Sequence, residues 1–503
     1  MSSLAGMAAV VLRLRALLVR AEKMLMVARP PLERGTVVFH PCGGSFQPAT
    51  VGVGRAPVPD GMLFAMSSGV TGTWGGGRRY RRPEGRSSSL DDVAVDKLNA
   101  KGTVLRMARS RSDEELLALQ RRGLELLRSP ETRGSFIAID VASSLNILSK
   151  RPTRLRVSAF IDEVQVRGVD VTGAMDAKGV PICLNALSKF ETVNSVFIDV
   201  LQRRGVEVVD TMNEQGVANC LNALGKVEGV DTDFVRLLQR RGVEVVATMN
   251  AQDVANCLNA LVKIEGVDMD FVDVLQRRGV EVIDEMDEQG VANCLNALAK
   301  IESIDMDFVG ELQRRGVEVV DEMDEQNVAN CLNAVCHPDR LHLVDMSFVR
   351  LLQGRVGVVN AMIAQQVSMS LYALQWIEDA DHAFVHELQQ RGLAVVAEMN
   401  SLDITNCLFA MSKMSKFDSS WQDAAFMEML QLCVLESDIE AEMDPKMIAK
   451  CLYALSRLDP ANVRDDAVLR LKSRADEVFE DMDEHSKIMT RGALERLGRG
   501  EDP

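Results

Sequence analysis

Asparagine and lysine recur at fixed positions around a repeated cysteine. Asn219 stands one residue before Cys220, and Asn222 and Lys226 stand two and six residues after it. In a helix, spacings of i, i+3 and i+7 put the three polar side chains on one face. An amide can donate to and accept from a base edge, and an ammonium group can pair with phosphate. The pattern therefore predicts a surface that could hold single-stranded nucleic acid.

The same set returns along the chain and defines the candidate RNA-binding residues. A basic pair on the preceding segment adds a line of arginines that could follow a phosphate backbone. The candidates are Asn219, Asn222, Lys226, Asn256, Asn259, Lys263, Asn293, Asn296, Lys300, Asn330, Asn333, Arg204, Arg241, Arg278 and Arg315. Structural roles are the alternative. The amides could form hydrogen bonds between helices, and the lysines could stabilise the negative end of a helix dipole. The arginines could form ion pairs with acids such as Asp231, Asp233 and Glu244.

One position varies while its surroundings stay constant, four residues before the cysteine. A protein that reads one base per repeat needs such a variable position. The candidate specificity residues are Gly216, Asp253, Gly290, Asn327, Gln366 and Asp403. In the last three repeats the second asparagine gives way to Tyr372, Phe409 and Tyr453. Aromatic rings in that position could stack on bases.

Catalytic and metal-binding patterns are weak. His382 and His386 have metal-compatible spacing but no evident third ligand, and Cys336, His337 and His342 form only a loose group. Neighbouring repeats should lie roughly 10 Å apart, which is too far for the repeated cysteines to form disulfides. These cysteines are interpreted as small packing residues. We expect no enzyme activity, no catalytic residue, no metal, no cofactor and no small-molecule substrate.

The polar positions are carried by a repeat of 37 residues. Cys183, Cys220, Cys257, Cys294 and Cys331 are each 37 residues apart. A constant period of about 20 to 50 residues is typical of a solenoid, whose repeats must stack to bury their apolar faces. We predict an all-α, right-handed α-solenoid of about nine helix-turn-helix repeats, with Ser144, Ser370, Cys407 and Cys451 marking further copies.

Each repeat contains two segments with helical spacing. Phe234, Leu237 and Leu238 define the first, and Val217, Leu221 and Leu224 define the second of the preceding repeat. Gly242 and the Val-Glu-Val-Val run after it are poor helix formers. The first helix could therefore end at Arg241, so a two-helix repeat and a bent repeat of three pieces both stay open.

Composition divides the chain into four parts. Residues 1–90 carry 12 Arg/Lys against four Asp/Glu, so a net charge of −16 for the whole leaves −24 for the remainder. The acid-free, basic first 21 residues are typical of an organelle transit peptide, and the apolar run Leu4–Leu12 is too short to span a membrane. We predict a disordered leader over 1–90, a lead-in helix over 91–112, the repeat array over 113–460 and C-terminal capping helices over 461–503. Arg78–Arg82 could contact RNA or flank a targeting peptide.

The second segment of each repeat resembles a known family. The run Gln-x-Val-Ala-Asn-x-Leu-Asn-Ala-Leu-x-Lys, at Gln215–Lys226, Gln252–Lys263 and Gln289–Lys300, is similar to the core of octotricopeptide repeats and of related repeats in FAST-kinase-like and RAP-domain organelle proteins. The resemblance covers about 113–460. Asparagine replaces the family tryptophan in six repeats, the period is 37 rather than 38, and no RAP domain is visible.

The resemblance implies an organelle protein that binds single-stranded RNA and acts in transcript stability, processing or translation. The mitochondrial matrix is the expected location, with the plastid stroma as the alternative. Other proteins could also be partners, and no membrane insertion is expected. A HEAT- or armadillo-like scaffold with an acidic surface is the alternative function.

Overall fold

The described part of the chain is entirely helical. The computed structural model describes residues 94–301, 303–336, 345–414 and 421–498, and every regular element in these ranges is an α-helix or a 3₁₀ turn. The chain divides into Met1–Ser89 and Leu90–Pro503, and the description concerns the second unit. The predicted leader, Arg78–Arg82, His337 and His342 lie outside the described residues.

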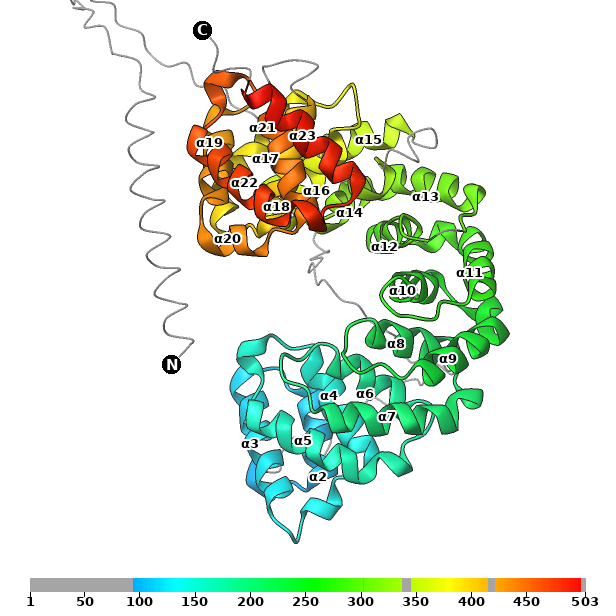
Figure 1. Ribbon diagram of the computed structural model, residues 1–503. Helices are drawn as coiled ribbons and strands as arrows, with labels where there is room; N and C mark the ends of the chain where they lie inside the picture. The colour runs from blue at the N-terminus through cyan, green and yellow to red at the C-terminus, as the bar shows by residue number, and fades with distance from the viewer. Residues whose placement is uncertain (1–93, 302, 337–344, 415–420, 499–503) are drawn as a thin grey trace, which may run out of the picture. The chain divides into compact units, whose positions relative to one another are not determined.

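Two sets of helices alternate along the sequence (Figure 1). The first helices of the repeats are α3 (Asp113–Arg128), α5 (Ser158–Val171), α7 (Ser195–Val208), α9 (Thr232–Val245), α11 (Met269–Glu281), α13 (Met306–Val319), α15 (Met346–Gln353), α17 (His382–Val395), α19 (Ala424–Val434) and α22 (Asp465–Val478). The second helices are α4 (Ala138–Ser149), α6 (Gly179–Leu187), α8 (Glu214–Leu224), α10 (Ala251–Leu261), α12 (Glu288–Leu298), α14 (Glu325–Val335), α16 (Ala364–Leu374), α18 (Ser401–Met414), α21 (Pro445–Leu455) and α23 (Glu484–Gly498). α2 (Ala100–Arg109) precedes the array, and the short α20 (Ser437–Glu442) lies between α19 and α21.

Short 3₁₀ turns complete the connections. Most of them follow a first helix directly. They are η1 (Val95–Lys97), η2 (Arg133–Ser135), η3 (Thr153–Leu155), η4 (Thr172–Ala174), η5 (Val209–Thr211), η6 (Val246–Thr248), η7 (Ile283–Glu285), η8 (Val320–Glu322), η10 (Val356–Ala361), η11 (Val396–Glu398), η13 (Pro460–Asn462) and η14 (Phe479–Asp481).

The helices form two layers. Each second helix packs on the second helices of the repeats before and after it, from α4 to α23, and most first helices pack on one another in the same order. The fold is therefore an α-solenoid, as the period predicted, and α22 with α23 continues the stack as a further pair. No helix of the described part is long and apolar enough to cross a membrane.

One repeat shows how the local sequence sets the elements. The Asp231 carboxylate accepts from the backbone N–H groups of Asp233 and Phe234 and starts α9. α9 then passes through Gly242 to Val245, and η6 follows before extended Met249. Asn250 starts α10 by accepting from Asp253 N at 2.9 Å. The repeat is thus two α-helices joined by a 3₁₀ turn, and the alternative end of the first helix at Arg241 is wrong.

Glycine is needed in the first helix because a ring of the next repeat occupies its side-chain space. A Cβ atom on Gly242 would lie 2.5 Å from Cε2 and Cζ of Phe271, which is fully buried. The pairs built in this way are Gly123 with Phe160, Gly168 with Phe197, Gly205 with Phe234, Gly242 with Phe271, Gly279 with Phe308, Gly316 with Phe348, and Gly392 with Phe426.

Two repeats carry valine in place of this glycine, and their first helices are short. Val356 and Val434 stand eight residues after Phe348 and Phe426, where seven other first helices have glycine. α15 has 8 residues and α19 has 11, whereas α9 has 14. α15 ends before its valine, at Gln353, and α19 ends at Val434.

A buried glutamine clamps each repeat to the next. Gln239 donates from Nε2 to Gly266 O at 2.9 Å, and its Oε1 accepts from Asp268 N at 2.7 Å. Gly266 presents this carbonyl from a left-handed conformation, φ +76°, that favours glycine. Gln120, Gln165, Gln202, Gln276, Gln313, Gln353, Gln389 and Gln431 also accept from the backbone of the following repeat.

Candidate nucleic-acid interface

The predicted asparagine and lysine residues lie together on one side of each second helix. On α8, Asn219 and Asn222 are partly exposed and Lys226 is exposed just beyond the helix end, while Cys220 and Leu221 between them are buried. Because α8, α10, α12 and α14 stack side by side, these positions form rows across the repeats. We call the rows the amide–lysine face, made of Asn219, Asn222, Lys226, Asn256, Asn259, Lys263, Asn293, Asn296, Lys300, Asn330 and Asn333.

The side-chain amides of this face have no hydrogen-bond partner within the described part of the protein. Among the described residues, none of its eight asparagine side chains makes a hydrogen bond with another protein group, and none of their polar atoms is buried without a partner. Asn213 and Asn250, in contrast, cap helices. The described part of the chain therefore contains no contact that supports the alternative, in which these asparagines form hydrogen bonds between helices. Their donors and acceptors are available to a ligand.

The lysines of the face repel one another. The pKa of Lys226 is lowered by partial burial and by the charges of Lys263 and Lys189. The pKa of Lys263 is lowered by partial burial and by Lys300. No ion pair joins any of these lysines to a carboxylate in the part of the chain that the structure describes. An anion placed beside this row of cations would relieve their mutual repulsion.

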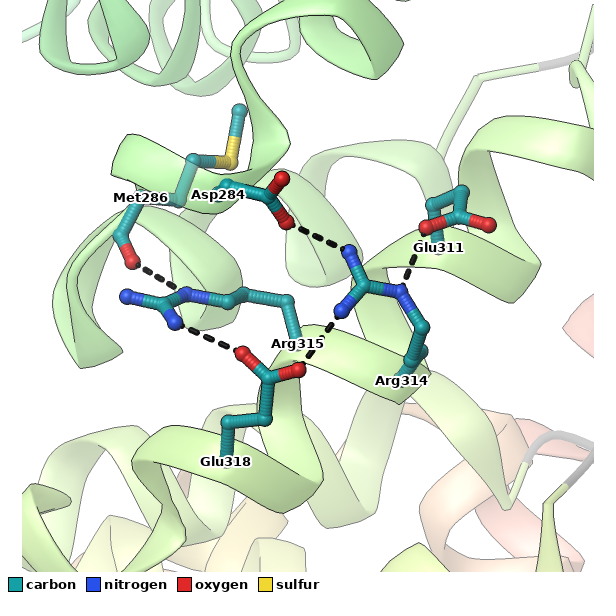
Figure 2. A network of polar contacts seen from close by, with 6 residues as sticks. All are labelled: Asp284, Met286, Glu311, Arg314, Arg315 and Glu318. Carbon is teal, nitrogen blue, oxygen red and sulfur yellow. Dashed lines mark hydrogen bonds and ion pairs between the residues drawn. The ribbon is translucent and has the colours of Figure 1, made fainter.

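The candidate arginines are held within the protein. Arg241 donates from Nε to Met212 O of the preceding repeat at 2.9 Å and pairs with Glu244 at 2.6 Å. Figure 2 shows the equivalent contacts of Arg315 with Met286 and Glu318, beside Arg314, which pairs with Asp284, Glu311 and Glu318. Arg204 and Arg278 repeat this arrangement. The geometry favours the alternative in which these arginines join repeats and pair with acids.

The candidate specificity residues lie in the first turn of the second helices and mostly face the core. Gly216, Asp253, Gly290, Asn327 and Asp403 are buried, and Gln366 is partly exposed. Asp253 forms a capping box with Asn250 at the start of α10, and burial raises the pKa of Asp253 to about 6. Asp403 accepts from Ser368 Oγ at 2.5 Å. Their role in reading bases stays a prediction, and burial argues against direct contact with a base.

The described cysteines and His382 pack against other parts of the protein. Every described cysteine is buried and outside any disulfide, and burial raises the pKa of Cys220 and its equivalents. His382 stacks on Trp421 with ring centroids 3.5 Å apart. Within the described ranges no three His, Cys, Asp or Glu side chains gather as a metal site would require. The cysteines thus occupy the packing position that their spacing predicts.

The sequence indicated neither the hydrogen bonds of the buried glutamine nor the packing role of the glycine, which it marked only as a poor helix former. Both belong to the recurring Leu-Gln-Arg-Arg-Gly segment, so the signal was their constancy from repeat to repeat. Their partners lie about one repeat further on, for example Gly266 and Phe271 for Gln239 and Gly242. The sequence also showed the change from asparagine to Tyr372, Phe409 and Tyr453 but not that these rings contact one another.

Comparison with known proteins identifies a related family for the first part of the array. Residues 93–342 match the family model of the RNA-editing substrate-binding complex 6 protein. This range includes α3 to α14 and the whole amide–lysine face. The match supports the broader expectation of a helical-repeat family associated with RNA, and it does not single out the octotricopeptide repeats.

Other comparisons add little. No curated protein matches the chain. Among solved structures, a chain of the "Homology model of the full-length AP-3 complex in an intermediate open conformation" is similar, with a TM-score of 0.31 and 9% identity over 77% of this chain and 74% of that chain. So low a TM-score carries no argument about function.

Proposed function

We propose that this chain is a non-catalytic subunit that binds single-stranded RNA along the amide–lysine face and acts in organelle RNA processing, RNA editing in particular. The observation that carries the proposal is the coexistence of open amides and uncompensated lysines in parallel rows. The rows offer hydrogen bonds to unstacked bases and charges to the backbone. Proteins that bind single strands commonly combine these two features.

Single-stranded RNA suits the face better than a duplex does. Sequence-specific RNA recognition uses base edges that a duplex hides, and each repeat offers two amides at similar positions. The overall charge of −24 outside residues 1–90 disfavours non-specific binding of polyanions, so binding depends on this local row of cations.

The comparison and the sequence together support the proposed location and partners. The family name refers to an RNA-editing substrate-binding complex, which supports other subunits of such a complex as protein partners. The basic, acid-free first 21 residues support the mitochondrial matrix. The plastid alternative and a role restricted to transcript stability or translation receive no support from the family match.

Fluorescence anisotropy of labelled RNA tests the proposal. The full chain should bind single-stranded RNA in preference to duplex DNA, and raising the salt concentration should weaken binding. Asn256→Ala with Asn259→Ala should weaken binding while the helix content and thermal transition stay unchanged, because both side chains are partly exposed. Absence of binding at low salt would favour the acidic protein scaffold as the function instead.

A further inference from the structure

The amide–lysine face changes character in the last repeats. The position held by asparagine in α4 to α14 is held by Tyr372 on α16, Phe409 on α18 and Tyr453 on α21. The ring centroids of Tyr372 and Phe409 are 6.3 Å apart at an interplanar angle of 28°. Those of Phe409 and Tyr453 are 5.7 Å apart at 38°. The three helices are neighbours in the second-helix layer, so the rings form a row in register with the asparagines.

Cations lie over this row of rings. Lys413 Nζ is 5.2 Å from the centroid of Phe409 and 5.3 Å from that of Tyr453. Lys450 Nζ is 5.3 Å from Tyr372, and Arg457 Cζ is 5.2 Å from Tyr453. Trp376 stands in the lysine position of its repeat, 5.9 Å from Lys413 Nζ. We call these residues the aromatic–cation cluster: Tyr372, Trp376, Phe409, Lys413, Lys450, Tyr453 and Arg457.

The cluster is not a buried core. Phe409 is buried, but Tyr372, Trp376, Tyr453, Lys413 and Lys450 are partly exposed and Arg457 is exposed. Burial and the nearby Lys446 lower the pKa of Lys450. Within the described ranges no carboxylate forms an ion pair with Lys413, Lys450 or Arg457. Three positive charges therefore remain beside partly open rings.

We infer that the aromatic–cation cluster anchors one end of the bound strand by stacking on its unpaired bases while its cations hold the adjoining phosphates. This inference rests on the proposed function and specifies how one part of the face contacts RNA. Planar bases match the rings, and an anion matches the excess of positive charge. A cationic ligand is disfavoured because Lys413 and Lys450, which lie over the rings, would repel it.

The aromatic–cation cluster and the asparagine repeats would contact RNA in different ways. The asparagine repeats offer hydrogen bonds, which depend on the identity of the base, whereas stacking accepts every base because each has a π-face. The C-terminal repeats should therefore supply affinity with little sequence preference. The asparagine repeats would then be left to discriminate between sequences.

The chain offers its own control substitution. Asparagine occupies this position in six other repeats, so Tyr372→Asn with Tyr453→Asn converts the cluster to the form found on α8 and α10. The double variant should bind single-stranded oligouridine about tenfold or more weakly. Its salt dependence should stay that of the wild type because every cation is retained. Helix content and melting temperature, measured alongside, establish that the variant is folded.

An abasic strand separates stacking from charge. The wild-type chain should bind an abasic ribose-phosphate strand more weakly than oligouridine of the same length. The double variant should lose less on the same change of strand, because only the hydrogen bonds of bases to the asparagines remain to be lost. Oligouridine should quench the tryptophan fluorescence of the wild-type chain, and the abasic strand should not. This quenching should be lost in the variant Trp376→Phe. This fluorescence test keeps the inference falsifiable even if the double variant does not fold.

Each contrary result has a distinct meaning. Wild-type affinity of the folded double variant, or equal wild-type affinity for abasic and normal strands, would overturn the stacking anchor and leave RNA binding intact. Competition by polyglutamate as effective as that by oligouridine would also overturn it, in favour of an acidic protein segment. Absence of any RNA binding by the wild type would overturn both the anchor and the proposed function.

Discussion

Gly242 and Phe271 meet across the repeat interface so closely that no side chain could be added to the glycine without moving the ring. A Cβ atom there would lie 2.5 Å from two carbons of Phe271. Glycine in a helix interior costs about 0.5–1 kcal/mol relative to alanine. The array accepts this cost in repeat after repeat because a buried phenyl ring contributes more, roughly 1.5–3 kcal/mol.

Substitution of the glycine tests this relationship. Gly242→Ala should destabilise the array by about 1–3 kcal/mol, since the ring must shift in a closely packed interface. The urea midpoint measures the change. Gly310→Ala is the matched control, because Gly310 is exposed on helix α13 and has no atom within 4 Å of its built Cβ position. That variant should gain about 0.5–1 kcal/mol instead. Stabilisation by both substitutions would contradict the packing described here.

The glutamine clamp gives a second prediction. Gln239→Leu removes the hydrogen bonds to Gly266 O and Asp268 N and leaves both groups without their partner. The expected loss of stability is about 1–3 kcal/mol. Gln252→Leu makes the same change at an exposed position on α10 and should leave the urea midpoint nearly unchanged. Hydrogen exchange at the Asp268 amide should rise in Gln239→Leu alone, and unaltered protection would argue against the clamp.

The sequence predicted what depends on contacts within one repeat. The 37-residue period of Cys220 and its equivalents predicted the solenoid. The spacing of Asn219, Asn222 and Lys226 predicted that they share one side of a helix. Contacts between repeats were harder to foresee. Gly242 was a helix breaker by propensity, yet its helix continues because the ring of Phe271 stabilises the interface. The pair of Arg241 with Glu244 was visible as spacing, whereas its bond to Met212 O was not.

Buried Asp253 should make stability depend on pH. Burial raises its pKa to about 6, against about 3.9 in the unfolded chain. The folded state thus binds the proton more tightly, so this contribution to stability is fully present below about pH 3.9 and is lost as pH rises through 6.

Replacement by an uncharged isostere should remove this dependence. Asp253→Asn should be more stable than the wild type at pH 7.5, by up to about 3 kcal/mol, and nearly equal to it at about pH 4. Asn327 fills the same buried position in another repeat, so the amide fits. Asp199→Asn, at an exposed position, is the control. Urea midpoints at the two pH values measure the effect, and equal differences at both would exclude titration of Asp253 as the cause.

The lysine row should set the salt dependence of RNA binding. Each cation that neutralises a phosphate of a single strand contributes about 0.7 to the slope of log K against log salt concentration. If Lys226, Lys263 and Lys300 each contact one phosphate, their joint replacement by glutamine should reduce the magnitude of the slope by about 2. Binding should also weaken most at low salt, where screening is least.

Removal of charge elsewhere provides the comparison. Arg236, Arg240 and Arg277 are exposed on first helices, so their joint replacement by glutamine changes the net charge equally without touching the amide–lysine face. That variant should keep the wild-type slope, because long-range attraction alone is screened beyond about 8 Å at physiological salt. Equal slopes for the lysine and arginine variants would mean that RNA responds to overall charge and is not held along this row.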